Sequence, residues 1–271
     1  EILSDGASAL YGSDAVAGVV NFITRRNSTA GEITVGYSKP QDGGAEEKRI
    51  NFSKGFGDLD ADGFNLLFAL SYDKRDPLKA TDRDFASSGR IQFERDGKRY
   101  QATNTVPSSN PANIFIPGQG FRNPYFEANG ECGPGTLEQR DPGTGNTSCY
   151  FDFVSNLEIF PERERTNLMT SFTKTLGNDH TLYADVLLSN SKSTGVIAPV
   201  PGAIRINRFS DAALWDAYVE PLGPGTTSGG NVRNTVFAYW RIEDLGKRID
   251  NNDADFRNVA LGLKGLIAGW D

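Results

Sequence analysis

Histidine, methionine and cysteine are scarce in this chain of 271 residues, which has one His, one Met and two Cys. A zinc site of the HExxH type needs two histidines, so His180 alone excludes it. A Ser-His-Asp triad would have to use His180, which closes a turn that begins at Gly177. No nucleophile elbow accompanies it, because Gly6–Leu10 has the serine without the second glycine. The sequence also has no P-loop or dinucleotide-binding pattern, so we expect no enzymatic activity, metal or cofactor.

Long apolar runs are absent as well. The longest, Phe64 to Leu70, contains Asn65 and falls far short of the ~18 residues of a membrane-spanning helix. The first residues lack the basic stretch followed by an apolar one that marks a signal peptide. Hydrophobic residues make up only 38% of the chain, which fits strands that have one face in water. The 30 glycines and 13 prolines predict many turns and few helices.

The charge balance excludes one class of partner. A net charge of −7 argues against a nucleic-acid-binding protein, which needs a basic patch to neutralise phosphates. Small ligands, metal chelates, sugars and peptides stay open.

The two cysteines, Cys132 and Cys149, lie in one Gly- and Pro-rich stretch. They are either a disulfide or two unrelated thiols. We favour the disulfide, because both flanks are polar and would leave a free thiol exposed. Closing this loop would contribute ~3 kcal/mol in the chain-entropy model. It would also place this part of the chain in the periplasm or outside the cell.

Six segments alternate between apolar and polar residues with the period of a β-strand. The third, residues 64–73, spans about ten residues, enough for a tilted strand to cross a bilayer. The side of each segment that holds most of its apolar residues consists of Ile33, Val35 and Tyr37, then Ile50, Phe52 and Phe56, then Phe64, Leu66, Phe68, Leu70 and Tyr72, then Leu168, Thr170, Phe172 and Leu176, then Leu182, Ala184, Val186 and Leu188, and finally Arg257, Val259, Leu261 and Leu263.

The connections between these segments differ sharply in length. Three are short turns, and two are long regions at about 75–164 and 193–252, which we expect to be irregular. After the first hairpin, short and long connections alternate. Transmembrane β-barrels have short turns on one rim and long loops on the other. Structureless loops of this length are rare in compact soluble domains, so the alternation favours a membrane barrel. Tyr37, Phe56, Tyr72 and Trp270 are near predicted strand ends and suit an interfacial aromatic girdle.

The opening residues combine a tight turn with a short apolar strand. Residues 7–11 can form one helical turn that Gly12 ends, and residues 16–23 are apolar and β-branched with a glycine inside. A plain Gly-rich turn before a buried strand is the alternative. The run consists of Asp5, Gly6, Ala7, Ser8, Ala9, Leu10, Tyr11 and Gly12, then Ala17, Gly18, Val19, Val20, Asn21, Phe22, Ile23 and Thr24, then Arg25 and Arg26.

This run resembles the end of the plug domain of TonB-dependent outer-membrane receptors. The resemblance implies an all-β chain: residues 1–30 end the plug, and 31–271 form about the first six strands of an antiparallel transmembrane β-barrel. Short turns would be periplasmic, and the long loops extracellular. It implies energised uptake of a scarce nutrient, such as a siderophore or carbohydrate, across a Gram-negative outer membrane. The implied partners are outer-membrane lipid and lipopolysaccharide, the small-molecule or oligosaccharide ligand, and the TonB complex, which would contact a plug segment absent from this sequence.

Two other classes compete with this interpretation. A secreted soluble β-sandwich with a binding or adhesive role would explain the strands, the acidity and a disulfide. A barrel without transport activity would explain the sorted loops. Asp58–Gly63 matches the first half of a calcium-binding EF-hand loop, but position twelve is then Ala69 in place of the required Glu. Within the second long loop, residues 204–209 could form a strand and residues 212–218 a short helix. Aromatic and basic residues there are candidates for lining a substrate vestibule, and the alternative for each is packing within the loop: Trp215, Tyr218, Tyr239, Trp240 and Arg241.

Overall fold

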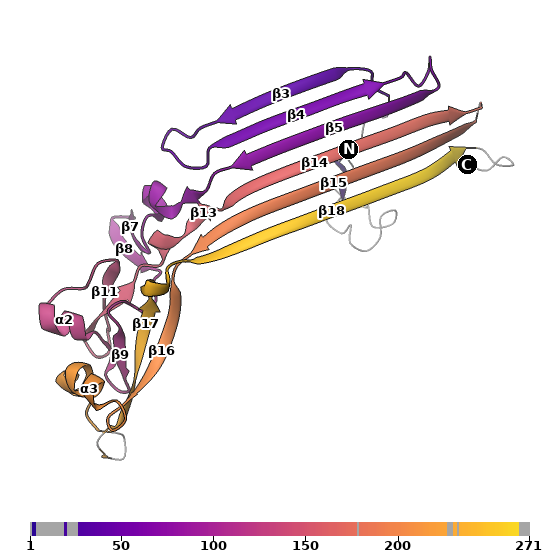
Figure 1. Cartoon of the computed structure of the whole chain (residues 1–271). Coiled ribbons are helices and arrows are strands. Elements are labelled where there is room, and N and C mark those ends of the chain that lie inside the picture. The colour runs from indigo at the N-terminus through magenta and orange to yellow at the C-terminus, as the bar shows by residue number, and fades with distance from the viewer. Residues whose placement is uncertain are drawn as a thin grey trace.

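A computed structural model of the chain describes residues 2–3, 19–20, 27–177, 179–226, 230–231 and 233–265. Antiparallel strands dominate them, which confirms the expected all-β class. The largest sheet has six long strands, and the smaller sheets and short helices of residues 76–161 and 198–247 gather beyond one end of it (Figure 1). No helix of the described residues has the length and apolarity needed to cross a membrane.

The six-stranded sheet is an up-and-down meander, with strands paired in the order in which they occur along the chain. Over the described residues the sheet is open, with β3 and β18 at its edges. Its strands are β3 (Gly31–Ser38), β4 (Glu47–Phe56), β5 (Phe64–Arg75), β14 (Glu162–Leu176), β15 (His180–Ile197) and β18 (Arg248–Gly265).

The pairing register joins the six predicted apolar sides into one band. Ile33 pairs with Phe52, and the same row continues through Leu70, Leu168 and Leu188. Because directly paired residues point to the same face of a sheet, these rows collect apolar side chains on one face, which also carries Lys54, Lys174 and Arg257. The band runs from Phe64 to Tyr72, roughly 27 Å along the strand at about 3.4 Å per residue.

The opposite face carries mainly polar side chains that hydrogen-bond to one another, and it also includes Leu67, Met169 and Leu187. Ser189 Oγ donates to Asn167 Oδ1 at 2.6 Å, and Asn167 Nδ2 donates to Ser71 Oγ at 2.9 Å. Asp73 accepts from Arg163 at 3.0 Å nearer the loop end. One face of the sheet is therefore mainly apolar and the other mainly polar.

Tight turns close the end of the sheet away from the smaller sheets. Gly57 has φ 74°, and a Cβ placed there would lie 2.7 Å from the Phe64 carbonyl oxygen, so only glycine fits. In the same turn the Asp58 carboxylate accepts from the backbone N–H groups of Asp60 (2.9 Å) and Ala61 (3.0 Å). Asp58 therefore stabilises a hairpin turn. Ala69, at the position where an EF-hand loop needs a Glu, is part of strand β5.

The segment before β3 crosses the polar face of the sheet. A Cβ on Gly55, which belongs to that face, would lie 1.5 Å from the Ser28 carbonyl oxygen. Asn65, 1% exposed, donates from its side-chain amide to that same oxygen at 3.0 Å. Residues 27–30 are thereby fixed against the hydrophilic side of β4 and β5.

Most of the opening run lies outside the described residues. This holds for Asp5, Gly6, Ala7, Ser8, Ala9, Leu10, Tyr11, Gly12, Gly18 and Asn21, and for Trp270 at the other end. Val19 and Val20 form β2 (Val19–Val20), which pairs antiparallel with β1 (Ile2–Leu3).

The prediction that the two long connections are otherwise irregular is wrong, whereas the strand expected at 204–209 and the short helix expected at 212–218 are confirmed by β16 (Val200–Asn207) and by the helical turns at 212–219. The two connections occupy 76–161 and 198–247 between the main strands, and both contain regular structure. Their strands are too short for a periodicity signal, and several pair with partners far away in the sequence. The elements are β6 (Leu78–Lys79), β7 (Arg90–Arg95), β8 (Lys98–Thr103), β9 (Asn113–Ile116), β10 (Gly120–Arg122), α2 (Pro124–Asn129), β11 (Thr136–Arg140), β12 (Thr147–Phe151), β13 (Glu158–Phe160), β16 (Val200–Asn207), α3 (Ala212–Leu214) and β17 (Thr235–Ile242), with a π-helical turn at Trp215–Val219 and 3-10 turns at Ala80–Asp82, Asp84–Ala86, Val154–Asn156, Glu220–Leu222 and Glu243–Leu245.

Both long connections contribute to one four-stranded sheet, ordered β10-β9-β17-β16. Its first two strands come from the first connection and the others from the second. Apolar side chains from both form the main buried cluster of the chain, with Ile116, Trp215 and Val219 each 0% exposed. The two connections therefore form one packed unit, which we call the loop module (residues 76–161 and 198–247).

A disulfide and a buried amide fix the first half of the loop module. Cys132 and Cys149 are bonded, with Cα atoms 5.5 Å apart. Asn113, 0% exposed, donates to the carbonyl oxygens of Pro107 (2.6 Å) and Cys149 (2.7 Å). Its own amide oxygen accepts from the Cys149 backbone N–H at 3.2 Å and from Asn123 Nδ2 at 2.9 Å. Strands β9 and β12 and the start of α2 are thus connected through one buried side chain.

Removing the disulfide should destabilise the loop module and leave the main sheet in place. The double change Cys132→Ser and Cys149→Ser frees a loop of 17 positions, which lowers the free energy of unfolding by about 3 kcal/mol in the chain-entropy model. Hydrogen exchange should then accelerate in β11 and β12 and stay unchanged in β5 and β14. A reductant should shift the wild-type chain to the same exchange pattern and leave the variant unaffected. Unchanged exchange in β11 and β12 would contradict this account.

Candidate pocket in the loop module

A pocket of about 970 Å³ opens on one face of the four-stranded sheet. Its floor is apolar, formed by Ile114, Ala238 and Ile204, which lie in one row because Ala238 pairs with both of the others. The next row, Ile206 and Val236, is buried. The helical segment 212–222 covers this second row through Trp215, Val219 and Leu222. Ile114 and Ala238 are each 2% exposed and belong to the same buried cluster, whereas Ile204, at the other end of the floor row, is 47% exposed. The pocket is therefore most open beside Ile204.

Helix α2 forms one wall of the pocket with Tyr125, Ala128 and Asn129. The helix starts here because the Asn123 side chain accepts from the backbone N–H groups of Tyr125 (3.0 Å) and Phe126 (3.1 Å). Pro124 at the first helical position has the required φ and no N–H to satisfy. Gly130 then ends the helix in the left-handed conformation.

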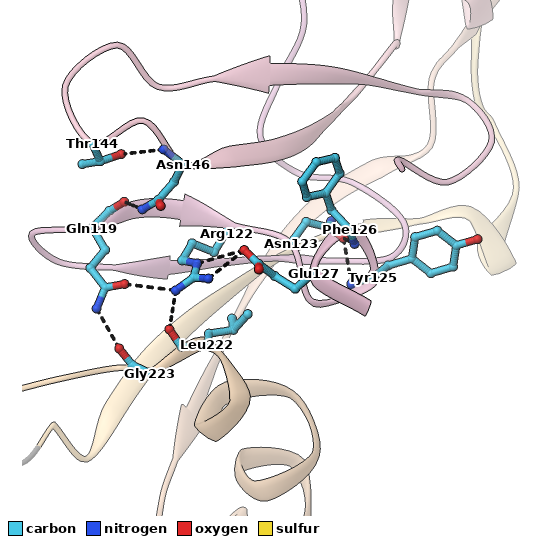
Figure 2. Close-up of polar contacts among 10 residues, drawn as sticks. All are labelled: Gln119, Arg122, Asn123, Tyr125, Phe126, Glu127, Thr144, Asn146, Leu222 and Gly223. Atoms are coloured by element: carbon cyan, nitrogen blue, oxygen red, sulfur yellow. Dashed lines mark hydrogen bonds and ion pairs between the residues drawn. The ribbon is translucent and has the colours of Figure 1, made fainter. Parts of the chain in front are cut away.

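Arg122 holds both walls of the pocket in position (Figure 2). Its guanidinium donates to Glu127 Oε1 on α2 at 2.7 and 3.1 Å. The same group donates to the carbonyl oxygen of Leu222, in the opposite wall. Gln119 adds a bond from Nε2 to the Gly223 carbonyl oxygen at 2.7 Å. Because β10 bonds both walls, the spacing between them is fixed without a ligand.

The second wall begins at a turn that the side chains of Asn207 and Asp211 stabilise by bonding to backbone N–H groups. The Asp211 carboxylate accepts from the Asn207 backbone N–H at 2.9 Å, and the Asn207 amide oxygen accepts from the N–H of Phe209 at 2.9 Å. The Asp211 carbonyl oxygen then accepts from Trp215 N–H at 2.9 Å. The bond from Asn207, together with one from the Ser210 hydroxyl, lowers the pKa of Asp211 below its usual value.

Few polar groups line the pocket, and the charged residue among the described lining residues is an acid. Glu127 contributes a carboxylate, which is paired with Arg122, and the described lining contains no Lys or Arg. Tyr125, Tyr218 and Trp240 contribute aromatic rings that each have one polar atom. A mostly apolar cavity with a few polar groups is typical of a small-molecule site.

Two of the five vestibule candidates line the pocket, namely Tyr218 and Trp240. Trp215 is buried beneath the wall, where its indole N–H donates to Glu220 at 2.8 Å. Tyr239 packs edge-on against Phe121, with ring centroids 5.1 Å apart. Arg241 is 3% exposed and donates to the Pro199 carbonyl oxygen at 2.6 Å. These three residues are structural.

Sequence reasoning missed Arg122, Glu127 and α2. An asparagine followed by proline, as in Asn123-Pro124, is a recognised signal for a helix start. The partners of Arg122 in the 222–223 turn leave no such signal, because they are distant in the sequence. Among the described residues there is no cluster of three or more His, Cys, Asp or Glu able to hold a metal ion. Comparisons with protein-family models, curated proteins and solved structures find no match to the chain.

Replacing Arg122 should loosen both walls at once. Arg122→Met removes charge-assisted bonds from a side chain that is 19% exposed, and should cost about 2 kcal/mol of local stability. Hydrogen exchange should accelerate in both 124–129 and 214–222. The matched control is Arg99→Met, whose ion pair with Glu94 spans 4.0 Å at 93% and 62% exposure and contributes at most about 0.5 kcal/mol. Faster exchange in one wall alone would contradict the shared role of Arg122.

The Asp211 turn should make this wall sensitive to acid. Its pKa is lowered in the folded chain, so its contribution is complete above the usual Asp pKa. That contribution is lost as the pH falls through the lowered value. Asp211→Ala should therefore be less stable than wild type at pH 7, and the difference should close in acid. Urea unfolding followed by tryptophan fluorescence measures this. The control is Asp216→Ala, an exposed residue on the same segment. A stability gap independent of pH would contradict the assignment.

Proposed function

We propose that this chain is part of a TonB-dependent receptor, with its six-stranded sheet in a Gram-negative outer membrane and its loop module outside the cell. The observation that carries the proposal is the register of the sheet. It collects apolar side chains on one face and hydrogen-bonded polar ones on the other, as a barrel wall between lipid and an aqueous lumen requires. The resemblance of residues 1–26 to the end of a plug supports the same assignment.

The ends of the sheet fit this orientation. Both long connections leave the sheet at the end where β5 and β15 end. The turn between β3 and β4 lies at this same end. There the apolar band ends at Tyr72. The next row on this face begins at Tyr37 and has three lysines and two acids, namely Lys48, Lys74, Glu164, Lys192 and Asp253. Aromatic residues and cations are suited to the level of lipid headgroups. In this assignment they face the phosphates of lipopolysaccharide.

The path of residues 27–30 supports a plug inside the barrel. They cross the polar face at Gly55 and Asn65, the face assigned to the lumen. A chain arriving from a plug in the lumen has to approach β3 from that side. In the proposed mechanism the loop module and plug capture a scarce nutrient, and the TonB complex pulls on the plug to open a path. This role is transport and not catalysis, and it needs no cofactor.

The soluble β-sandwich explains the apolar band less well. A sandwich buries such a band beneath a second sheet, and no sheet of the described residues packs on it. Val35 and Val259 on the band are 73% and 74% exposed. In water this surface would drive aggregation, whereas in a bilayer it is solvated by lipid.

A pair of arginine substitutions in one strand tests the proposal in the full-length receptor. Val186→Arg puts a charge in the middle row of the apolar band, and costs about 2–4 kcal/mol if that face meets lipid. Leu187→Arg, the next residue, puts the same charge on the opposite face. We expect Val186→Arg to lower the amount of heat-modifiable protein in outer membranes, and Leu187→Arg to assemble like wild type. Equal assembly of both, or a wild-type protein found in the soluble fraction, overturns the proposal.

A further inference from the structure

The pocket between α2 and segment 212–222 has the chemistry for a particular class of ligand. Its floor residues, Ile114, Ile204 and Ala238, have no side-chain hydrogen-bonding group. A ligand group that rests on them loses its water and gains no polar partner there. Hydroxyl groups buried in this way cost free energy, so a hydroxyl-rich sugar is a poor occupant of the floor.

The electrostatics of the pocket disfavour anions. The described lining contains no cation, and its carboxylate, Glu127, is negative. The nearest guanidinium, Arg122, already donates to Glu127 and to the Leu222 carbonyl oxygen. A carboxylate or an anionic metal chelate would be desolvated without a counter-charge.

The rim differs from the floor. Tyr125, Tyr218 and Trp240 supply flat aromatic rings, together with hydroxyl and indole N–H groups. Aromatic rings pack well on other rings, and their polar atoms can bond to an isolated hydroxyl or carbonyl group. Arg122 already bonds to both walls, at Glu127 and at the Leu222 carbonyl oxygen, so little ordering is needed on binding.

We propose that this pocket binds an uncharged, predominantly apolar ring compound with one or two hydroxyl or carbonyl groups. The rings lie against Ile204, at the exposed end of the Ile114–Ala238–Ile204 row, and the polar groups meet the aromatic rim. The inference rests on the proposed function only in making this compound the transported nutrient or part of it.

Equilibrium dialysis with three probes tests the ligand class, using the full chain kept in solution with an amphipathic polymer. Estradiol is uncharged, with four rings and two hydroxyl groups. Estradiol 3-sulfate has the same rings and a negative charge, and maltotriose is uncharged and polar. We expect estradiol to bind best. Tighter binding of maltotriose or of the sulfate to the wild-type chain overturns the proposal.

Two substitutions at matched exposure place the binding in the pocket. Ile204 on the floor is 47% exposed, and Phe237 on the opposite face of the sheet is 45% exposed. Ile204→Glu should weaken estradiol binding about tenfold or more, because a carboxylate replaces apolar floor. Phe237→Glu should change the affinity for estradiol by less than about twofold. Estradiol that partitions into the polymer contributes equally to both measurements. Equal effects, or none, overturn the proposal.

A gain of binding completes the test. Ile204→Lys supplies the missing counter-charge, so it should bind estradiol 3-sulfate more tightly than the wild-type chain does. If Ile204→Lys does not bind estradiol 3-sulfate more tightly and Ile204→Glu still binds estradiol like wild type, the ligand does not bind in this pocket. These binding results can be told apart from results on membrane assembly. A receptor that assembles in outer membranes and does not bind estradiol overturns the ligand class alone, and a soluble chain that binds it overturns only the transport proposal.

Discussion

The cross-strand register of the six-stranded sheet is the constraint on which the rest of the structure depends. Side chains alternate between faces with a period of two, so a slip of one residue in any pairing would move that strand's apolar residues to the polar face. The observed pairs avoid this. Phe52 meets Leu70, Leu70 meets Leu168 and Leu168 meets Leu188. On the other face the Ser71–Asn167–Ser189 chain of hydrogen bonds forms only in this register. Both faces therefore specify the same alignment.

The register also places the loop module. Strands β5, β14, β15 and β18 continue together past the apolar band before the long connections begin. The connections consequently leave from neighbouring positions, which brings β9 and β17 within pairing distance despite their separation in the chain. From there the structure is held by buried polar groups as well as by apolar packing. Asn113 connects β9, β12 and α2, and its loss would leave several buried partners unsatisfied.

The sequence predicted those elements whose side chains repeat a local pattern. The alternation of Phe64, Leu66, Phe68, Leu70 and Tyr72 predicted β5 and its apolar face, and each main strand was predicted in this way. The predicted strands were shorter than the real ones at the loop end, because pairs such as Arg163–Ser193 and Asn252–Ser193 have no apolar side to reveal them. The joining of the two long connections into one loop module was not predicted, since Phe237 pairs with Phe115 across a gap that contains the whole β14–β15 hairpin.

The same reasoning explains why aromatic content alone identified the pocket only in part. Trp215 and Trp240 are alike in sequence context, rich in apolar neighbours, yet one is buried under the wall and the other lines the cavity. Trp215 belongs to the segment that covers the sheet, whereas Trp240 is part of β17 itself. Segment 212–222 forms one buried cluster with the Ile206–Val236 row and with Ile114 and Ala238, and leaves Ile204 47% exposed. The cavity therefore opens beside Ile204, and Arg122 links α2 to the Leu222 carbonyl oxygen. The floor is apolar because two of its three residues, Ile114 and Ala238, belong to the buried cluster. Its ligand specificity then depends on the few polar groups of its walls.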